Sequence, residues 1–170
     1  MDPRCEADFR HFIISRSAAL FRTAYLLTGD RHAAEDLVQS ALAKTAAKWS
    51  TLRDPTAIEA YVRRAMYHEQ VSRWRRRGRL TETAMGNVPD HADEGHADSA
   101  DLRLTMRAAL SRLTSRQRTV LVLRYFEDLS ETEISHVLGI GVGSVRSQIY
   151  RSLERLKKTA PELDAVRELQ

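Results

Sequence analysis

Residues 129–151 read LSETEISHVLGIGVGSVRSQIYR, and this stretch decides the fold of the C-terminal part of the chain. Ser130 and Glu133 have the spacing of a capping box, which is typical of the first turn of a short helix. Gly139 lies where the chain needs a positive φ to leave that helix, and Ile140 can fill the angle between two helices. The spacing therefore predicts a helix-turn-helix.

The second helix of this motif, which is expected to begin at Ser144, has two chemically different sides. Apolar residues that must pack on the preceding helices fall on one side, namely Val145, Ile149, Leu153 and Leu156. The other side carries Arg146, Ser147, Tyr150 and Arg151. A solvated face is the usual interpretation for an arbitrary amphipathic helix. The capping box and the glycine turn favour binding in a DNA major groove instead, where arginines reach guanine edges or phosphates.

Outward from this motif, helical spacing of apolar residues extends over most of the chain. It is present from Leu102 to Tyr125, and three longer helices are expected within residues 9–27, 30–49 and 57–77, with Asp30 as the N-cap of the second. Short connections between these three helices predict one small bundle. The sequence therefore predicts an all-α fold of two small helical domains, residues 1–78 and 102–170, joined by a flexible acidic linker.

The expected linker, residues 79–101, has no sustained periodicity and carries 6 acidic against 1 basic residue. Residues 1–78 carry 14 basic against 9 acidic residues, and residues 102–170 carry 12 against 8, so two basic segments flank an acidic one. The net charge of +4 is consistent with a polyanionic partner. The linker either occupies positively charged channels of a partner or is a solvated tether that sets the spacing of the domains.

Several function classes receive no support from the sequence. Cys5 is the single cysteine, so no internal disulfide can form, and a reducing cytoplasm is the expected location. No apolar run approaches the roughly 18 residues of a membrane span, and the first residues lack a signal-peptide pattern. A membrane is therefore not an expected partner. A small-molecule substrate is not expected either.

A metal-dependent enzyme is the main catalytic alternative, because the linker contains several residues with metal-ligating side chains. These are His91, Asp93, Glu94, His96 and Asp98. Their segment offers no scaffold to hold ligands at metal geometry, and no phosphate-binding loop, nucleophile elbow or CxxC pair occurs elsewhere. We therefore expect no metal, no cofactor, no catalytic residues and no enzymatic activity.

Two further surfaces are expected in the N-terminal bundle. Glu35, Asp36 and Gln39 lie opposite the apolar side of the second helix, where they either pair with arginines of a partner protein or are merely hydrated. In the third helix, Tyr67 and Trp74 occur where arginines accumulate. Aromatic and basic residues in alternation suit single-stranded nucleic acid, but both rings could equally complete the core.

At this point the sequence resembles a known family. Three segments carry the resemblance: DRHAAEDLVQ (30–39), YVRRAMYHEQVSRWRRR (61–77) and LTSRQRTVLVLRYFEDLSETEISHVLGIGVGSVRSQIYRSLERL (113–156). In this order around an acidic linker they resemble an extracytoplasmic-function (ECF) sigma factor of RNA polymerase, of the SigE-like actinobacterial branch. The resemblance covers nearly the whole chain apart from the linker and the last dozen residues.

The resemblance implies a sigma factor that directs core RNA polymerase to promoters and promotes their melting. Glu35, Asp36 and Gln39 would dock on the β′ clamp helices, and the C-terminal domain would lie against the β flap. Residues implied to contact the −10 element are Arg63, Arg64, His68, Arg73, Trp74, Arg75, Arg76 and Arg77. Residues implied to contact the −35 element are Ser144, Arg146, Ser147, Tyr150 and Arg151. Promoter DNA is thus a partner, and an anti-sigma factor is a further candidate.

The chain departs from the family pattern at four positions. His68 stands where the family commonly has Asn, and Ser135 stands where Ala is common. Thr114 and Ser144 replace a usual Pro and Thr, and both are expected to keep helix-capping chemistry. A repressor or response-regulator output domain is the alternative for the helix-turn-helix alone. It would leave the 30–39 segment unexplained, and residues 1–78 show no strand-helix alternation for a phospho-acceptor domain.

Overall fold

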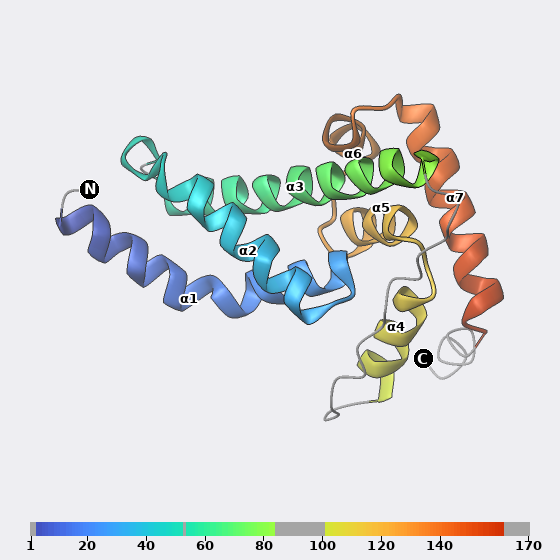
Figure 1. The fold of residues 1–170 in the computed structure, drawn as a ribbon. Coiled ribbons are helices and arrows are strands. Elements are labelled where there is room, and N and C mark those ends of the chain that lie inside the picture. Colours follow the sequence, from blue (N-terminus) through green and yellow to red (C-terminus); the bar gives the residue numbers. More distant parts are fainter. Residues whose placement is uncertain (1–2, 53, 84–100, 162–170) are drawn as a thin grey trace.

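The computed structural model describes residues 3–52, 54–83 and 101–161. Every regular element within these ranges is a helix, which confirms the predicted all-α fold with two helical domains (Figure 1). The elements are α1 (Pro3–Thr28), α2 (Arg31–Ala46), the 3₁₀ turn η1 (Trp49–Thr51), α3 (Pro55–Thr83), α4 (Asp101–Ser111), α5 (Ser115–Tyr125), α6 (Glu131–Leu138) and α7 (Val142–Thr159).

Side-chain caps define the starts of three helices. Asp30 accepts a hydrogen bond from the Ala33 backbone N–H at 2.7 Å and caps α2, as predicted. Thr114 and Ser130 each form a complete capping box, at the starts of α5 and α6 respectively. Each box satisfies backbone N–H groups that the first turn leaves without intrahelical partners.

The start of α7 differs from the prediction, because Ser144 does not cap this helix. The N-cap is Gly141, which has extended backbone angles and provides no side-chain hydrogen bond. Glycine is tolerated at this position, so the helix can begin at Val142 and Ser144 lies exposed within its first turn. The prediction of capping by Ser144 was therefore wrong, whereas that by Thr114 is confirmed.

The first domain consists of α1, α2 and α3, which pack on one another. Its interior is made of apolar side chains from all three helices, among them Leu20, Leu27, Leu37, Val62 and Met66. The α3 helix continues to Thr83, beyond its expected end near Arg77. A glycine inside a helix costs only about 1 kcal/mol, so Gly78 does not end the helix.

The second domain is built around α5, against which α6 and α7 pack. Leu123, Ile134, Leu138 and Val145 are fully buried and form its centre. Gly139 ends α6 with a φ of 63°, the left-handed conformation that the sequence predicted for this turn. Val145, one of the apolar positions that the sequence spacing indicated, thus belongs to the centre of the helix-turn-helix.

The two domains pack directly against each other. The α5 helix contacts α1, and both α5 and α6 contact α3. Figure 1 shows the second half of α3 extending between α6 and α5, with α7 beyond its end. Buried residues of both domains form one continuous hydrophobic core. The sequence did not predict this packing, and the stretch 84–100 lies outside the described residues.

Candidate functional site

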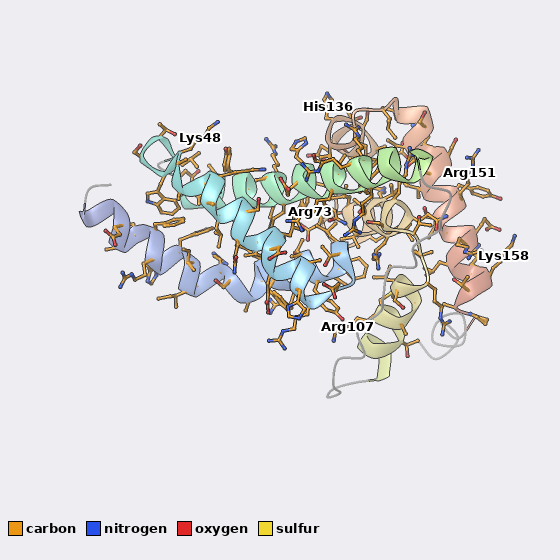
Figure 2. The ribbon with its side chains drawn as sticks, viewed as in Figure 1. Lys48, Arg73, Arg107, His136, Arg151 and Lys158 are labelled. Atoms are coloured by element: carbon orange, nitrogen blue, oxygen red, sulfur yellow. The ribbon has the colours of Figure 1, made fainter. Side chains whose placement is uncertain are left out.

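The predicted DNA-contacting face of α7 is exposed. Val145 and Ile149 are buried against the rest of the domain, whereas Arg146, Ser147, Tyr150 and Arg151 lie on the accessible side with Ser144. Figure 2 shows Arg151 on the outer side of α7, away from the other helices. A helix presenting arginines and short polar groups on a free side has the chemistry required for a major groove.

One arginine of this face is engaged with the neighbouring helix. Arg146 Nε lies 2.5 Å from a carboxylate oxygen of Glu131 in α6, although the Arg146 side chain remains 69% exposed. Binding of Arg146 to DNA would therefore have to compete with this ion pair. Among the described residues, Arg151 forms no ion pair of this kind.

Polar contacts lie at both ends of α6 in the helix-turn-helix. The Ser135 hydroxyl donates to the Ile140 carbonyl at 2.6 Å and thus ties α6 to the turn. Hydrogen bonds from the backbone N–H and the hydroxyl of Ser130 lower the pKa of Glu133 below its ordinary value. The role of Ser135 was missed from the sequence, where its departure from the family pattern was the available signal.

The α2 face expected to dock on a protein partner is accessible. Asp36 and Gln39 are exposed, and Glu35 is 42% exposed and paired with Arg31 at 3.1 Å. These residues lie opposite the buried side of α2, which includes Leu37 and Ala41. The face combines carboxylate and amide groups that can accept hydrogen bonds from arginines.

The predicted −10 contacts on α3 divide into two groups in the structure. Arg73 and Arg76 belong to the group near α2, where both pair with Glu69 at 3.4 Å. Lys44 of α2 pairs with the same carboxylate at 2.7 Å, and its hydrogen bond lowers the Glu69 pKa. Arg77 is exposed beyond this cluster. The arginines that pair with Glu69 are thus only partly available for phosphate contacts.

The second group on α3 faces the C-terminal domain, and Arg63 is central to it. Arg63 Nη1 donates to Glu127 at 2.8 Å and to the Thr23 hydroxyl at 3.0 Å, and its Nη2 donates to Glu59 at 3.0 Å. The Tyr67 hydroxyl donates to the same oxygen of Glu127. Thr23 completes the cluster by donating to the other Glu127 oxygen at 2.9 Å.

Burial and charge change the acidities within this cluster. Burial, together with the hydrogen bond to Glu127, raises the pKa of the Tyr67 hydroxyl above its ordinary value. Burial opposes the charged form of Arg63, but the charge of Glu127 raises its pKa overall. Tyr67 is 3% exposed, so its ring belongs to the core, one of the two roles that the sequence left open. Nothing in the sequence pattern indicated Glu127 or Thr23.

Trp74 and Arg75 also contact the C-terminal domain. The Arg116 guanidinium of α5 lies 5.3 Å from the centre of the Trp74 ring, within the range of a cation–π contact. The Trp74 indole N–H is buried without a hydrogen-bond partner among the described residues. Arg75 donates to the Leu138 carbonyl at the end of α6. Two side chains predicted to read DNA are thus engaged by α5 and α6.

A groove of about 940 Å³ opens between the domains beside this cluster. Arg64 and His68 of α3 line one side, and His136 of α6 lines another. Arg64 and His68 are exposed to solvent within this groove. In Figure 2, His136 lies on α6, above the second half of α3 in this view. The groove is therefore lined by basic, imidazole and carboxylate groups next to apolar residues, and it is bounded by both domains.

Metal and membrane sites find no support in the described part of the chain. Among residues 3–52, 54–83 and 101–161, no cluster of His, Cys, Asp and Glu is suited to a metal ion. The metal-ligand alternative, with His91 and His96 among its residues, lies outside these ranges. No helix within them has the length and apolar character needed to span a membrane.

Comparison with known families gives two matches along the chain. Residues 13–80 match Sigma-70 region 2, and residues 103–156 match Sigma-70 region 4. The first match contains most of α1–α3, and the second contains α5, α6 and most of α4 and α7. Their order and extent agree with the two helical domains of the structure.

Curated relatives and a solved structure agree with these matches. The RNA polymerase sigma-E factor of Streptomyces coelicolor is 37% identical over 93% of this chain and 90% of the relative. The ECF RNA polymerase sigma factor SigL of Mycobacterium tuberculosis is 30% identical, with 89% and 88% covered. The sigma factor RpoE from Bartonella quintana, solved in complex with the anti-sigma factor NepR, is 26% identical. It matches with a TM-score of 0.66, covering 89% of this chain and 95% of that one.

Proposed function

The chain belongs to the sigma-70 family of RNA polymerase sigma factors, and on this basis we propose how its helices divide the work of promoter recognition. The family assignment and the ECF relatives identify a promoter-specific transcription initiation factor. Three surfaces, on α2, α3 and α7, are proposed to contact core polymerase, the −10 element and the −35 element.

The observation that carries the proposal is the exposed face of α7 on a capped helix-turn-helix. Arg146 and Arg151 can reach guanine edges or phosphates, while Ser144, Ser147 and Tyr150 provide hydroxyl groups beside them. We assign this face to the −35 element, within a C-terminal domain of residues 102–170. In this position the domain would also lie against the β flap of the polymerase.

The exposed α2 face is proposed to bind core polymerase. Asp36 and Gln39 are accessible in the structure, and Glu35 could exchange Arg31 for an arginine of the β′ clamp helices. Residues 1–78 would form the domain that carries this face. The complex of the RpoE relative with NepR makes an anti-sigma factor a candidate partner of this chain as well.

The α3 helix is proposed to read and melt the −10 element. Arg63, Arg64 and the cluster Arg73–Arg77 would contact phosphates, and His68 with Trp74 would hold bases turned out of the duplex. His68 is exposed in the groove, as a base-contacting residue must be. The linker, predicted as residues 79–101, is proposed to thread a positively charged polymerase channel; α3 ends at Thr83 and α4 begins at Asp101, and residues 84–100 lie outside the described residues.

Binding to core polymerase tests the docking part of this proposal. We expect Asp36→Lys to weaken the affinity of labelled protein for core polymerase at moderate salt, because it replaces an acceptor with a cation. Helical content and thermal unfolding should not change, since Asp36 is exposed. Asp8→Lys is the matched control, as Asp8 is also exposed but lies on α1. Equal affinities of both variants and wild type would remove α2 from the interface.

A further inference from the structure

A second pocket, of about 150 Å³, lies where α2 and α5 begin beside α3. Four of the residues that line it come from α3 at the spacing of one helix face, namely Gln70, Arg73, Trp74 and Arg77. Ser115 lines it from the start of α5. The pocket therefore gathers side chains with N–H and O–H donors from two helices.

The indole N–H of Trp74 is a donor of this pocket that lacks an acceptor. Its nitrogen is buried, and it has no hydrogen-bond partner among the described residues. The indole nitrogen can only donate, and a buried donor without an acceptor is destabilising. An acceptor bound in the pocket beside Trp74 would remove this cost.

Two further donors of the pocket can serve the same acceptor. Arg73 (Figure 2) uses its Nε for Glu69 at 3.4 Å and its Nη1 for the Ala33 carbonyl at 3.3 Å, and these contacts leave its Nη2 for a ligand. The Ser115 hydroxyl oxygen accepts from Gln70 at 3.2 Å. Because a hydroxyl also carries one hydrogen to donate, Ser115 can turn that hydrogen to a ligand.

Charge and size restrict the ligand to a small oxyanion. Arg73 and Arg77 bring two positive charges, against the carboxylate of Asp30, which caps α2 by accepting from the Ala33 backbone N–H. Ser115 is the first residue of α5, and the amino end of a helix favours an anion. One water needs about 10–15 Å³ and drug-sized ligands need about 300 Å³ or more, so the pocket suits a group of a few atoms.

The pocket lies on a different side of α3 from the side proposed to read bases. Since an α-helix turns by about 100° per residue, Arg73 and Arg77 are about 140° and 180° around the helix from His68. The pocket and the groove that contains His68 share no lining residue. An anion in the pocket therefore leaves His68 accessible.

We propose that this pocket binds a free phosphate ion, with the Trp74 indole N–H, the Arg73 guanidinium and the Ser115 hydroxyl as its donors. A tetrahedral oxyanion presents acceptor atoms in several directions, which suits donors that come from two helices. The bound phosphate links α3 to the start of α5. This inference does not rest on the role proposed for α3 at the −10 element.

NMR spectra of the full chain, labelled with ¹⁵N in its tryptophans, test the site directly. The chain has two tryptophans, so two indole N–H signals are expected, and Trp74→Phe identifies the signal of Trp74. Trp49 is the internal control, because it packs against Phe9 and Phe12 instead of lining the pocket. Sodium phosphate is titrated in parallel with sodium chloride at equal pH and ionic strength.

We expect only the Trp74 signal to move to higher proton chemical shift and to saturate with phosphate, because its N–H gains an acceptor. Arg73→Gln should weaken phosphate binding by about tenfold or more, since it removes a charge-assisted hydrogen bond. Arg10→Gln is the matched control, because it removes an exposed arginine of α1, and it should leave phosphate binding unchanged.

Two results would overturn the proposal. The first is a Trp74 signal that phosphate does not move, or that moves in parallel with the Trp49 signal, because the pocket would then hold only water. The second is a Trp74 signal that responds to a short single-stranded DNA oligonucleotide but not to phosphate. The donors of the pocket would in that case serve the DNA backbone.

Discussion

The two arginines of the α7 face provide the most detailed prediction. Arg151 is exposed, whereas Arg146 is paired with Glu131 at 2.5 Å. We predict that Arg151→Ala weakens binding to −35 duplex DNA more than Arg146→Ala does. The reason is that Arg146 must give up its ion pair before it contacts DNA, while Arg151 gives up no contact of this kind.

The magnitudes follow from the kind of contact each arginine makes. A bidentate arginine on guanine contributes about 1–3 kcal/mol of discrimination, which is the expected loss for Arg151→Ala. An exposed ion pair such as Arg146–Glu131 is worth about 0.2–1 kcal/mol, and this amount reduces the net contribution of Arg146 to DNA binding. Glu131→Gln should therefore strengthen DNA binding by up to the same amount.

Fluorescence anisotropy at fixed salt, with duplexes that vary one −35 base pair at a time, measures these differences. A base contact by Arg151 should appear as lost preference at one base pair, whereas a phosphate contact weakens all duplexes alike. The double variant of Glu131→Gln and Arg146→Ala separates release of Arg146 from a general charge effect. Unchanged affinity of Arg151→Ala for every duplex would refute the assignment of this face. If Glu131→Gln strengthened DNA binding equally in the presence and in the absence of Arg146, the competition between Glu131 and DNA for Arg146 would be refuted.

Three further predictions concern α3, the turn of the helix-turn-helix and the α2–α3 contact. His68→Ala should reduce open-complex formation on duplex promoters more than on pre-melted templates, because capture of a flipped base offsets unstacking; equal losses on both templates would exclude this role. Gly139→Ala should lower the free energy of unfolding by about 1–2 kcal/mol in urea titrations, because its φ of 63° is strained for alanine. Gly139→Asn should lose less of the free energy of unfolding than Gly139→Ala. Equal stability of the wild type and both variants would contradict this reason. The hydrogen bond from Lys44 lowers the pKa of Glu69 below its ordinary 4.5. The ionised Glu69 carboxylate therefore stabilises the fold above pH 4.5, and this stabilisation is lost as the pH falls through the folded pKa. Wild type should lose more stability than Glu69→Gln between about pH 7 and pH 3 in urea titrations, and parallel losses would contradict this linkage.

The features that the sequence predicted correctly are those set by neighbouring residues. The Ser130–Glu133 capping box and the left-handed Gly139 depend on interactions within one turn, so their spacing identifies them. The burial of Val145 and Ile149 follows from helical periodicity in the same way. Ser144 was misjudged because Gly141, which has no capping side chain, was not considered as the start of α7.

The contact between the domains could not be predicted because it joins residues far apart in the chain. Thr23 and Glu127 are separated by 104 positions, and neither belongs to a periodic pattern or a motif. A single glutamate after a helix is usually solvated, so only the packed structure identifies its burial. The cation–π contact between Arg116 and Trp74 could not be predicted either, because it depends on the placement of α5 against α3.

Transcription in vitro with this protein and bare core polymerase on genomic DNA, with start sites mapped, tests the central claim most directly. If the chain is a promoter-specific sigma factor, start sites absent with core alone should appear, and they should share one upstream and one downstream element. A set of start sites identical to that of core polymerase alone would contradict the account.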